Sequence, residues 1–190
     1  IKSVSCGYFH TACLDRDGIV YTFGCNNNNQ LGRDNWVLKS TNQPQILDLP
    51  KIKQVCCGNS FTSCVSEEGD LYSFGGNTYG ELGFGDVSIV KGRCKSDVIK
   101  NIDFMECGGQ YAIYKLMDGS VVGCGLNYFG ELGTESRSSR ITPYQYTNLP
   151  DDIIDIKCGK NHSLILTSKN QVLSCGYNKN GQLGRETGDE

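Results

Sequence analysis

The sequence predicts an all-β fold in which a four-stranded unit is repeated about four times. Cys-Gly begins at Cys6, Cys57, Cys107 and Cys158, and Leu-Gly begins at Leu31, Leu82, Leu132 and Leu183. Short strand-like segments alternate with glycine turns, and almost no stretch has the periodicity of a helix. Repeats of about fifty residues with this pattern are typical of β-propeller blades. We therefore expect one domain, residues 1–190, with repeat units starting near the four Cys-Gly pairs.

The first three strands of each unit follow from its apolar segments and its turns. Segments 52–55 and 153–156 precede a Cys-Gly pair and are rich in Ile and Val, which favour strands. In the first copy, segments 9–14 and 19–23 flank a turn that ends in glycine, which predicts a hairpin. The residues at this turn position are Gly18, Gly69, Gly119 and Asn170, all of which tolerate a positive φ.

The asparagine run 26–29 aligns with the tips of the other copies. Asn26 matches Asn77, Asn127 and Asn178, while Asn29 stands where the other copies have Gly80, Gly130 and Gly181. We therefore predict a left-handed backbone at Asn29. Residues 45–50 suggest a fourth, outer strand, and the chain contains three outer connections for its four units.

A family resemblance follows from the complete repeat. The pattern Cys-Gly-x-x-His-Thr, then Asp-Gly-x-Val-Tyr-x-Phe-Gly-x-Asn-x-x-Asn-Gln-Leu-Gly, resembles the regulator of chromosome condensation (RCC1) repeat and covers essentially the whole chain. The resemblance implies RCC1-type blades, which in this family typically close into a seven-bladed ring. Four units imply a partial propeller or part of a larger one. An open arc exposes sheet faces, so we expect flanking repeats, a covering partner or self-association through the open ends.

Composition excludes several classes of function. The net charge is -3, from 18 Lys and Arg against 21 Asp and Glu. This charge disfavours binding to a nucleic acid. The longest apolar runs are far too short to cross a bilayer, so we expect no membrane insertion. The eleven cysteines are odd in number and form no Cys-x-x-Cys pair. We therefore expect reduced thiols and an intracellular location, cytoplasmic or nuclear.

The sequence specifies little chemistry. His10 and His162 occupy the position that Phe61 and Tyr111 fill in the other copies, which favours packing over catalysis. Two histidines without metal-ligand spacing do not predict a metal site. The chain has no P-loop motif, so we expect no nucleotide cofactor and no small-molecule substrate.

The predicted function is an interaction platform that binds a macromolecular partner, most simply a protein, through propeller-face loops. The candidate residues are Thr78, Tyr79, Tyr128, Phe129 and Lys179 at the tips, and Trp36, Lys91, Arg93 and Lys95 in the connecting segments. Aromatic side chains are efficient interface anchors, whereas packing against the neighbouring blade is the alternative role for the tip aromatics. The basic residues at 91–95 are either a phosphate or acidic-partner contact or a solvated loop.

Two alternatives stay open beside the platform. The resemblance implies guanine-nucleotide exchange on a Ran-like small GTPase, an activity that requires no covalent chemistry from the propeller. No insertion interrupts the regular units to supply the wedge used by exchange factors of this family. Chromatin or DNA association is disfavoured by the net charge. A single tryptophan also argues against the ultraviolet-sensing branch of the family, whose chromophore is a tryptophan cluster.

Overall fold

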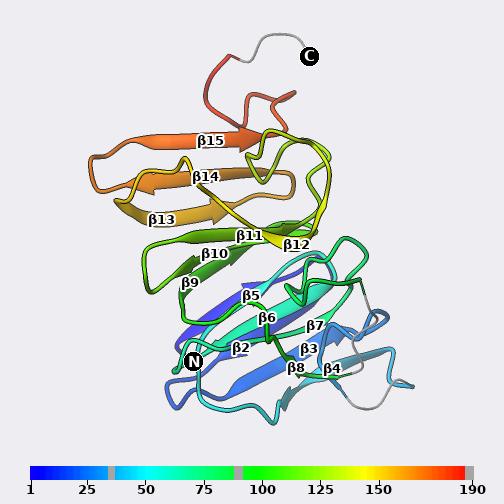
Figure 1. Cartoon of the computed structure of the whole chain (residues 1–190). Helices are drawn as coiled ribbons and strands as arrows, with labels where there is room; N and C mark the ends of the chain where they lie inside the picture. The colour runs from blue at the N-terminus through cyan, green and yellow to red at the C-terminus, as the bar shows by residue number, and fades with distance from the viewer. Residues whose placement is uncertain (34–36, 88–91, 187–190) are drawn as a thin grey trace.

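The chain forms four successive antiparallel sheets, which confirms the predicted all-β propeller architecture (Figure 1). The computed structural model describes residues 1–33, 37–87 and 92–186, and strands are the regular elements in these residues. Each sheet is a blade in which consecutive strands pair in chain order. The inner strands of the blades are β1, β5, β9 and β13.

The strand bounds repeat closely from blade to blade. Blade 1 contains β1 (Ser3–Cys6), β2 (His10–Leu14), β3 (Val20–Cys25) and β4 (Ser40–Ile46), and blade 2 contains β5 (Ile52–Cys57), β6 (Phe61–Ser66), β7 (Leu71–Gly75) and β8 (Cys94–Lys95). Blade 3 contains β9 (Ile102–Cys107), β10 (Tyr111–Leu116), β11 (Val121–Gly125) and β12 (Arg140–Gln145), and blade 4 contains β13 (Ile153–Cys158), β14 (His162–Thr167) and β15 (Val172–Gly176). Blade 4 has three strands within the described residues, in agreement with the three outer connections found in the sequence.

The predicted outer strand of blade 1 is present, but its predicted bounds were wrong. We expected residues 45–50, whereas β4 ends at Ile46 and Leu47 is buried beyond it. The strand begins earlier because Ser40 and Thr41 pair with the end of β3, around a register shift. Pro44 fits in β4 because an edge strand does not need every backbone N–H for pairing.

The predicted turn conformations are confirmed. Gly18 and Asn170 have φ values of 84° and 61°, so asparagine replaces glycine in the fourth hairpin as expected. Asn29 has a φ of 62°, close to the 83° of Gly80 at the same position in blade 2. The asparagine run is therefore an ordered turn of blade 1.

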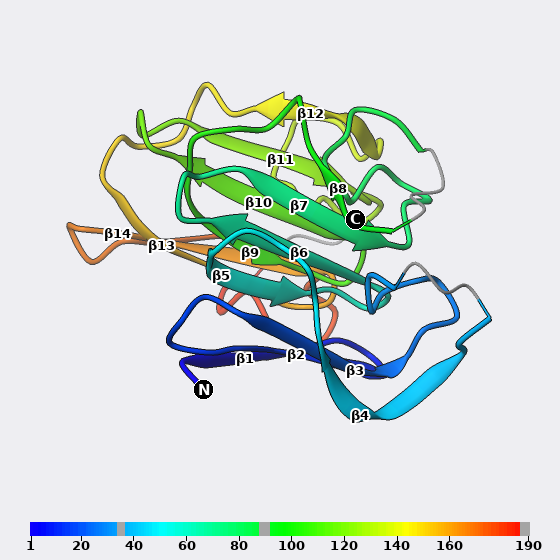
Figure 2. The same cartoon turned by 90° about the horizontal axis from the view of Figure 1, so that it is seen from below.

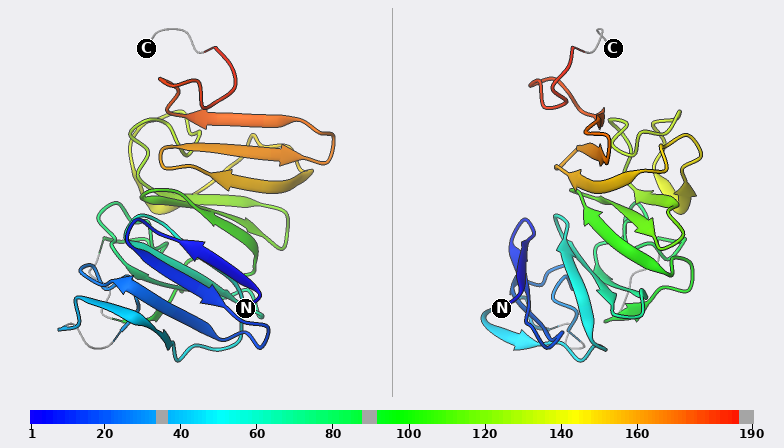
Figure 3. Two further views of the ribbon diagram at one scale, coloured as in Figure 1. Left: turned by 180° about the vertical axis from the view of Figure 1, so that it is seen from behind. Right: turned by 90° about the vertical axis from the view of Figure 1, so that its left-hand side faces the viewer.

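The blades follow one another around an arc, with successive sheets layered on each other (Figures 2 and 3). A separate apolar cluster fills each of the three spaces between blades. Ala12, Leu14 and Phe74 belong to the first cluster, Phe61, Met105 and Tyr114 to the second, and Tyr111, Ile113 and Ile165 to the third. The outermost sheets have solvent on one side, where Val4 and Val172 are exposed. Burial between neighbouring blades thus holds the arc together.

The Cys-Gly pair recurs because a ring packs directly on its glycine. A Cβ built on Gly7 would lie 2.1 Å from the His10 ring, and one on Gly58 would lie 1.9 Å from the Phe61 ring. Tyr111 and His162 occupy the same place over Gly108 and Gly159. Since no side chain fits into these gaps, only glycine allows the ring to cover the inner turn.

In blades 1 to 3, the ring over the glycine also contacts the next blade. The His10 Nε2 atom lies 2.9 Å from Thr62 Oγ1, whose hydroxyl donates to the Gln30 carbonyl at 2.8 Å. Because the Thr62 proton is used in that bond, the Nε2–H of His10 is the donor to Thr62. Burial lowers the pKa of His10 to about 4, which keeps its ring neutral.

The other two blade junctions vary this contact. Tyr111 lies 3.0 Å from Ser163 Oγ, which donates to the Glu131 carbonyl at 2.7 Å. At the junction of blades 2 and 3 the corresponding residues are Phe61 and Ala112, and both belong to one apolar cluster. Polar rings therefore meet a hydroxyl in the next blade, and the apolar ring meets a methyl group.

Replacing the polar pair with the apolar one tests this rule. Thr62→Ala should lower the free energy of unfolding by about 1–3 kcal/mol, because His10 and the Gln30 carbonyl lose a buried partner. The double variant His10→Phe/Thr62→Ala recreates the pair at the next junction and should lose at least 1 kcal/mol less than the sum of the single variants. Urea unfolding of all four proteins at pH 7 measures this coupling, and strict additivity would contradict the rule.

The pH dependence of the same proteins provides a control. The folded-state pKa of His10 lies below its unfolded value of 6.5, so its contribution to stability is lost as pH falls from 6.5 towards 4. The His10→Phe variants should lose less stability over this range than the wild type. Equal losses would show that His10 does not titrate in this way.

Candidate functional site

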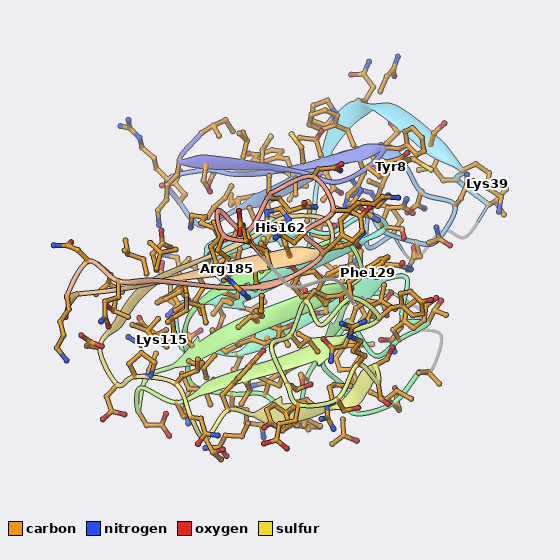
Figure 4. The ribbon with its side chains drawn as sticks, turned by 90° about the horizontal axis from the view of Figure 1, so that it is seen from above. Tyr8, Lys39, Lys115, Phe129, His162 and Arg185 are labelled. Atoms are coloured by element: carbon orange, nitrogen blue, oxygen red, sulfur yellow. The ribbon has the colours of Figure 1, made fainter. Side chains whose placement is uncertain are left out.

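One end of the arc gathers two loops from every blade. The inner turns are residues 7–9, 58–60, 108–110 and 159–161, and the tip loops are residues 26–30, 77–81, 127–131 and 178–182. A backbone bond joins the two sets in each blade, such as Cys25 N to Phe9 O at 2.7 Å. We call this end the turn face and the opposite end the hairpin face. Figure 4 shows Tyr8 and Phe129 on the turn-face side and Lys115 on the opposite side.

The inner turns are tied together by backbone hydrogen bonds that run from blade to blade. Tyr8 N donates to Asn59 O at 3.0 Å, Asn59 N donates to Gly109 O at 2.8 Å, and Gly109 N donates to Lys160 O at 3.0 Å. These four residues follow the four Cys-Gly pairs. Their side chains differ in every blade, while their backbones form one continuous rim.

The rim surrounds a shallow axial cavity of about 230 Å³. Its lining comes from all four blades: Cys6, Gly7, Tyr8, Cys57, Gly58, Asn59, Cys107, Gly108, Gly109, Cys158, Gly159 and Lys160. Burial raises the pKa of the Cys57 thiol to about 12 and that of Cys107 well above its usual range. Thiols held in the protonated form are poor nucleophiles, so Cys57 and Cys107 are poorly suited to nucleophilic chemistry.

Each tip loop is fixed by the asparagine that recurs at its start. The Oδ1 atom of Asn26 accepts from Leu31 N at 3.0 Å, and its Nδ2 donates to Leu38 O at 2.9 Å. Asn127 makes the same pair of contacts, with Leu132 N at 2.8 Å and Ser136 O at 2.6 Å. The asparagine in every copy therefore joins the tip loop to the segment that follows it.

A second polar side chain in each tip loop accepts a hydrogen bond from the backbone of the same loop. Glu81 and Glu131 each accept a backbone N–H, from Tyr79 and Phe129 respectively, both at 2.7 Å. Gln30 makes the same contact in blade 1, with Asn28 N at 2.9 Å. Both glutamates are fully buried, and desolvation raises the pKa of each carboxyl. The Oε1 atom of Glu131 is also buried and has no hydrogen-bond partner.

Two parts of the chain match the sequence pattern of the Regulator of chromosome condensation (RCC1) repeat, at residues 17–65 and 118–166. A second pattern of the same repeat matches residues 1–30, 52–81 and 153–182. The chain belongs to the RCC1 repeat family. The resemblance inferred from the Cys-Gly and Leu-Gly motifs is confirmed.

Two curated relatives align with nearly all of this RCC1 chain. The ultraviolet-B receptor UVR8 of Arabidopsis thaliana is 32% identical over 97% of the chain and 43% of the relative. The human probable E3 ubiquitin-protein ligase HERC4 is 31% identical over 98% of the chain and 23% of the relative. The chain thus spans less than half the length of each.

The RCC1 fold also matches a solved structure, that of Prp20p from Saccharomyces cerevisiae. The TM-score is 0.68 at 20% sequence identity, and the match covers 92% of this chain and 56% of the other. At this identity the match shows the fold alone. Prp20p itself binds Gsp1p and histones.

The RCC1 tips bring the five predicted tip residues to the turn face. Thr78, Tyr128 and Lys179 are exposed, and Tyr128 keeps 69% of its surface accessible. Tyr79 and Phe129 are half-buried. Phe129 packs edge-on against Tyr177 of blade 4, with ring centroids 4.8 Å apart. Phe129 therefore makes the blade-to-blade contact that was the alternative role for the tip aromatics, while Tyr128 faces solvent.

The two predicted residues of the connecting segments that the structure describes, Arg93 and Lys95, have different contacts. Arg93 is half-buried and donates to Gly32 O at 3.0 Å, which links blade 2 to blade 1. Lys95 forms an ion pair with Asp70 at 2.5 Å on the outer edge of blade 2. Trp36 and Lys91 lie outside the described residues.

Sequence reasoning missed three residues of the turn face: Tyr8, Phe9 and Lys160. Tyr8 and Phe9 are 64% and 69% exposed, and their rings lie 4.5 Å apart. Phe9 was assigned to a strand, whereas β2 begins at His10. The two residues after each Cys-Gly pair vary between the copies, and no packing contact requires them to be aromatic. Aromatic residues at these variable loop positions are the signal that would have identified Tyr8 and Phe9.

The described residues contain no group of three metal-ligating side chains, and they form no helix that would span a membrane. No disulfide joins any two cysteines in the described part of the chain. What the turn face offers is a rigid rim with exposed aromatic and cationic side chains. Such an arrangement is suited to recognition.

The buried glutamate under the third tip yields a test of this architecture. Because the folded-state pKa of Glu131 is raised, the wild type gains stability as pH falls and loses it as pH rises through that pKa. Glu131→Gln, which copies Gln30, should raise the free energy of unfolding at pH 7 by about 1 kcal/mol and show no gain at pH 4. Denaturant unfolding at both pH values measures the difference.

The matched control is Glu135→Gln, because Glu135 is exposed in the segment that follows the same tip. This variant should be within about 0.5 kcal/mol of the wild type at both pH values. A Glu131→Gln protein that is less stable than the wild type at pH 7 would show that the carboxylate is favoured at this position.

Proposed function

We propose that this chain is a protein-interaction module that binds a macromolecular partner through its turn face. The observation that carries the proposal is the exposure of Tyr8, Phe9 and Tyr128 on loops whose backbones are held by repeated hydrogen bonds. Large aromatic side chains exposed on a rigid frame lose little entropy on binding and supply most of the energy of many interfaces.

The relatives support a role in recognition. UVR8 is a receptor and HERC4 is a probable ubiquitin ligase, so related repeats occur in proteins with different activities. A propeller face whose loops vary while its framework repeats is a suitable common component of such proteins. As part of the same proposal, the partner is a protein, and the chain acts in the nucleus or the cytoplasm.

Guanine-nucleotide exchange on a Ran-like GTPase stays the alternative. Its support is the family resemblance and the fold of Prp20p, whose identity to this chain is 20%. Release of a fluorescent nucleotide from Ran-like and Rab-like GTPases distinguishes the two. Acceleration of release by this chain would favour exchange, and the platform proposal expects none.

Partner capture with turn-face variants tests the platform. The variant Tyr8→Ser/Phe9→Ser/Tyr128→Ser should recover about tenfold less of any partner bound by the wild type, as expected when interface anchors are removed. Quantitative mass spectrometry of proteins captured from cell lysate provides the measurement. Phe129 is left intact because its contact with Tyr177 contributes to packing between blades.

The matched control removes an exposed apolar side chain from the opposite end of the arc. Met117 at the hairpin face is 56% exposed. Met117→Ser should capture the same partners as the wild type. Equal capture by all three proteins, or loss in the control alone, would overturn the assignment to the turn face.

A further inference from the structure

Charged side chains are distributed unequally between the two ends of the arc. The hairpin turns at one end, with residues 151–152 beside the fourth turn, carry two basic side chains, Arg16 and Lys169, and seven acidic ones: Asp15, Asp17, Glu67, Glu68, Asp118, Asp151 and Asp152. On the turn face, the acidic residues of the inner turns and tip loops are Glu81 and Glu131, and both are buried. The basic residues of those loops, Lys160 and Lys179, are both exposed.

Lys160 occupies a distinctive place on the turn face. It is the one charged residue that lines the axial cavity. Its Nζ atom lies over the Tyr8 ring of blade 1, 6.0 Å from the centre of the ring. Among the described residues Lys160 has no ion pair, whereas Lys95, Lys100, Lys157 and Lys169 each pair with an acidic side chain.

The backbone around Lys160 is already ordered. Its carbonyl accepts from Gly109 N at 3.0 Å, as the last bond of the rim, and the Tyr8 N–H supplies the first. The Tyr8 and Phe9 rings pack edge-on beside the same mouth. A cation and an aromatic pair are therefore held next to each other at the mouth of one cavity.

We propose that the mouth of the axial cavity binds an extended acidic peptide segment of a partner protein. A carboxylate of that segment lies over Lys160, and a neighbouring apolar side chain packs on Tyr8 and Phe9. The proposal rests on the interaction function proposed above and specifies its partner chemistry. Exposed carboxylates are absent from the described inner turns and tip loops, so an acidic peptide meets no repulsion there.

A peptide fits these observations better than a nucleic acid. Binding to a phosphate backbone relies on neutralising several phosphates, whereas Lys160 and Lys179 are the exposed cations of these loops. The acidic hairpin face and the net charge of -3 also oppose a polyanion that extends over the molecule. A short peptide reaches the mouth without approaching the hairpin face.

Fluorescence anisotropy with a labelled peptide tests the proposal on the full chain. The probe is a twelve-residue peptide in which Asp alternates with Ser around a central Phe, and its matched control has Asn in place of Asp. The Asp peptide should bind about tenfold more tightly than the Asn peptide at about 50 mM salt, and the difference should shrink at 500 mM. Equal affinity for the two peptides would overturn the proposal.

Three protein variants locate the binding. Lys160→Glu should weaken binding of the Asp peptide about tenfold and that of the Asn peptide little. Tyr8→Ser should weaken both. Lys169→Glu makes the same change of net charge on the hairpin side and should leave the affinity unchanged, and thermal unfolding confirms that all variants are folded. If Lys160→Glu and Lys169→Glu weaken binding of the Asp peptide equally, the effect is due to net charge alone, and the assignment of the binding site to the cavity mouth is wrong.

A labelled twelve-base-pair DNA duplex is the competing ligand. If the duplex binds more tightly than the Asp peptide, and Lys160→Glu abolishes its binding, the ligand of the cavity mouth is a nucleic acid and the peptide proposal is wrong. Failure of the Asp peptide, combined with partner loss in the Tyr8→Ser/Phe9→Ser/Tyr128→Ser capture, would overturn the acidic chemistry and leave the platform in place. Failure in both experiments would overturn both proposals.

Discussion

The packing of a ring onto the glycine of each Cys-Gly pair is the constraint on which the other features depend. The His10 ring lies over Gly7 and the Phe61 ring lies over Gly58, so tightly that a Cβ on either glycine would clash. This contact brings each inner turn back over its own blade. The turns then lie close enough to the axis for Tyr8, Asn59, Gly109 and Lys160 to join through their backbones. The rim, the cavity and the free side chains around them follow from that position.

The same contact links the core to the turn face. Thr62, which accepts from His10, donates to the carbonyl of Gln30 in the preceding tip loop. Packing between two blades and the position of a functional loop are therefore coupled through one hydroxyl. A loop held in this way loses little entropy when a partner binds, because its backbone is ordered before binding. Variation is left to the side chains that no neighbour contacts.

Much of this fold could be predicted from the sequence because its signals are local and repeated. The spacing of Cys-Gly and Leu-Gly identified the blades, and glycine or asparagine at fixed places identified the turns, including the left-handed Asn29. The outer strand of blade 1 was misplaced because its position depends on the register with β3 and on a shift in that register. Register of this kind depends on tertiary pairing more than on local composition.

The site was harder to predict because adjacent residues in the loops have different environments. Tyr128 and Phe129 are neighbours of similar size, yet Phe129 packs on Tyr177 and Tyr128 is exposed. The difference is set by the next blade, about fifty residues away in the sequence. Lys160 gave no signal because a single lysine after Cys-Gly is ordinary until the fold places it beside Tyr8. Long-range contacts, which the repeat pattern does not encode, thus decide which loop residues are free.

The two ends of the arc are complementary halves of the junction that holds the blades together. In blade 4, His162 packs over Gly159 as His10 does over Gly7, but within the described residues no hydroxyl of a following blade reaches its ring. In blade 1, Thr11 stands at the position of Thr62 and Ser163, whose hydroxyls form a hydrogen bond with the ring of the preceding blade. One end therefore presents the ring of this pair and the other presents the hydroxyl. A further repeat or a second copy that joins head to tail satisfies both groups, whereas a face-to-face contact between two like ends leaves them unpaired.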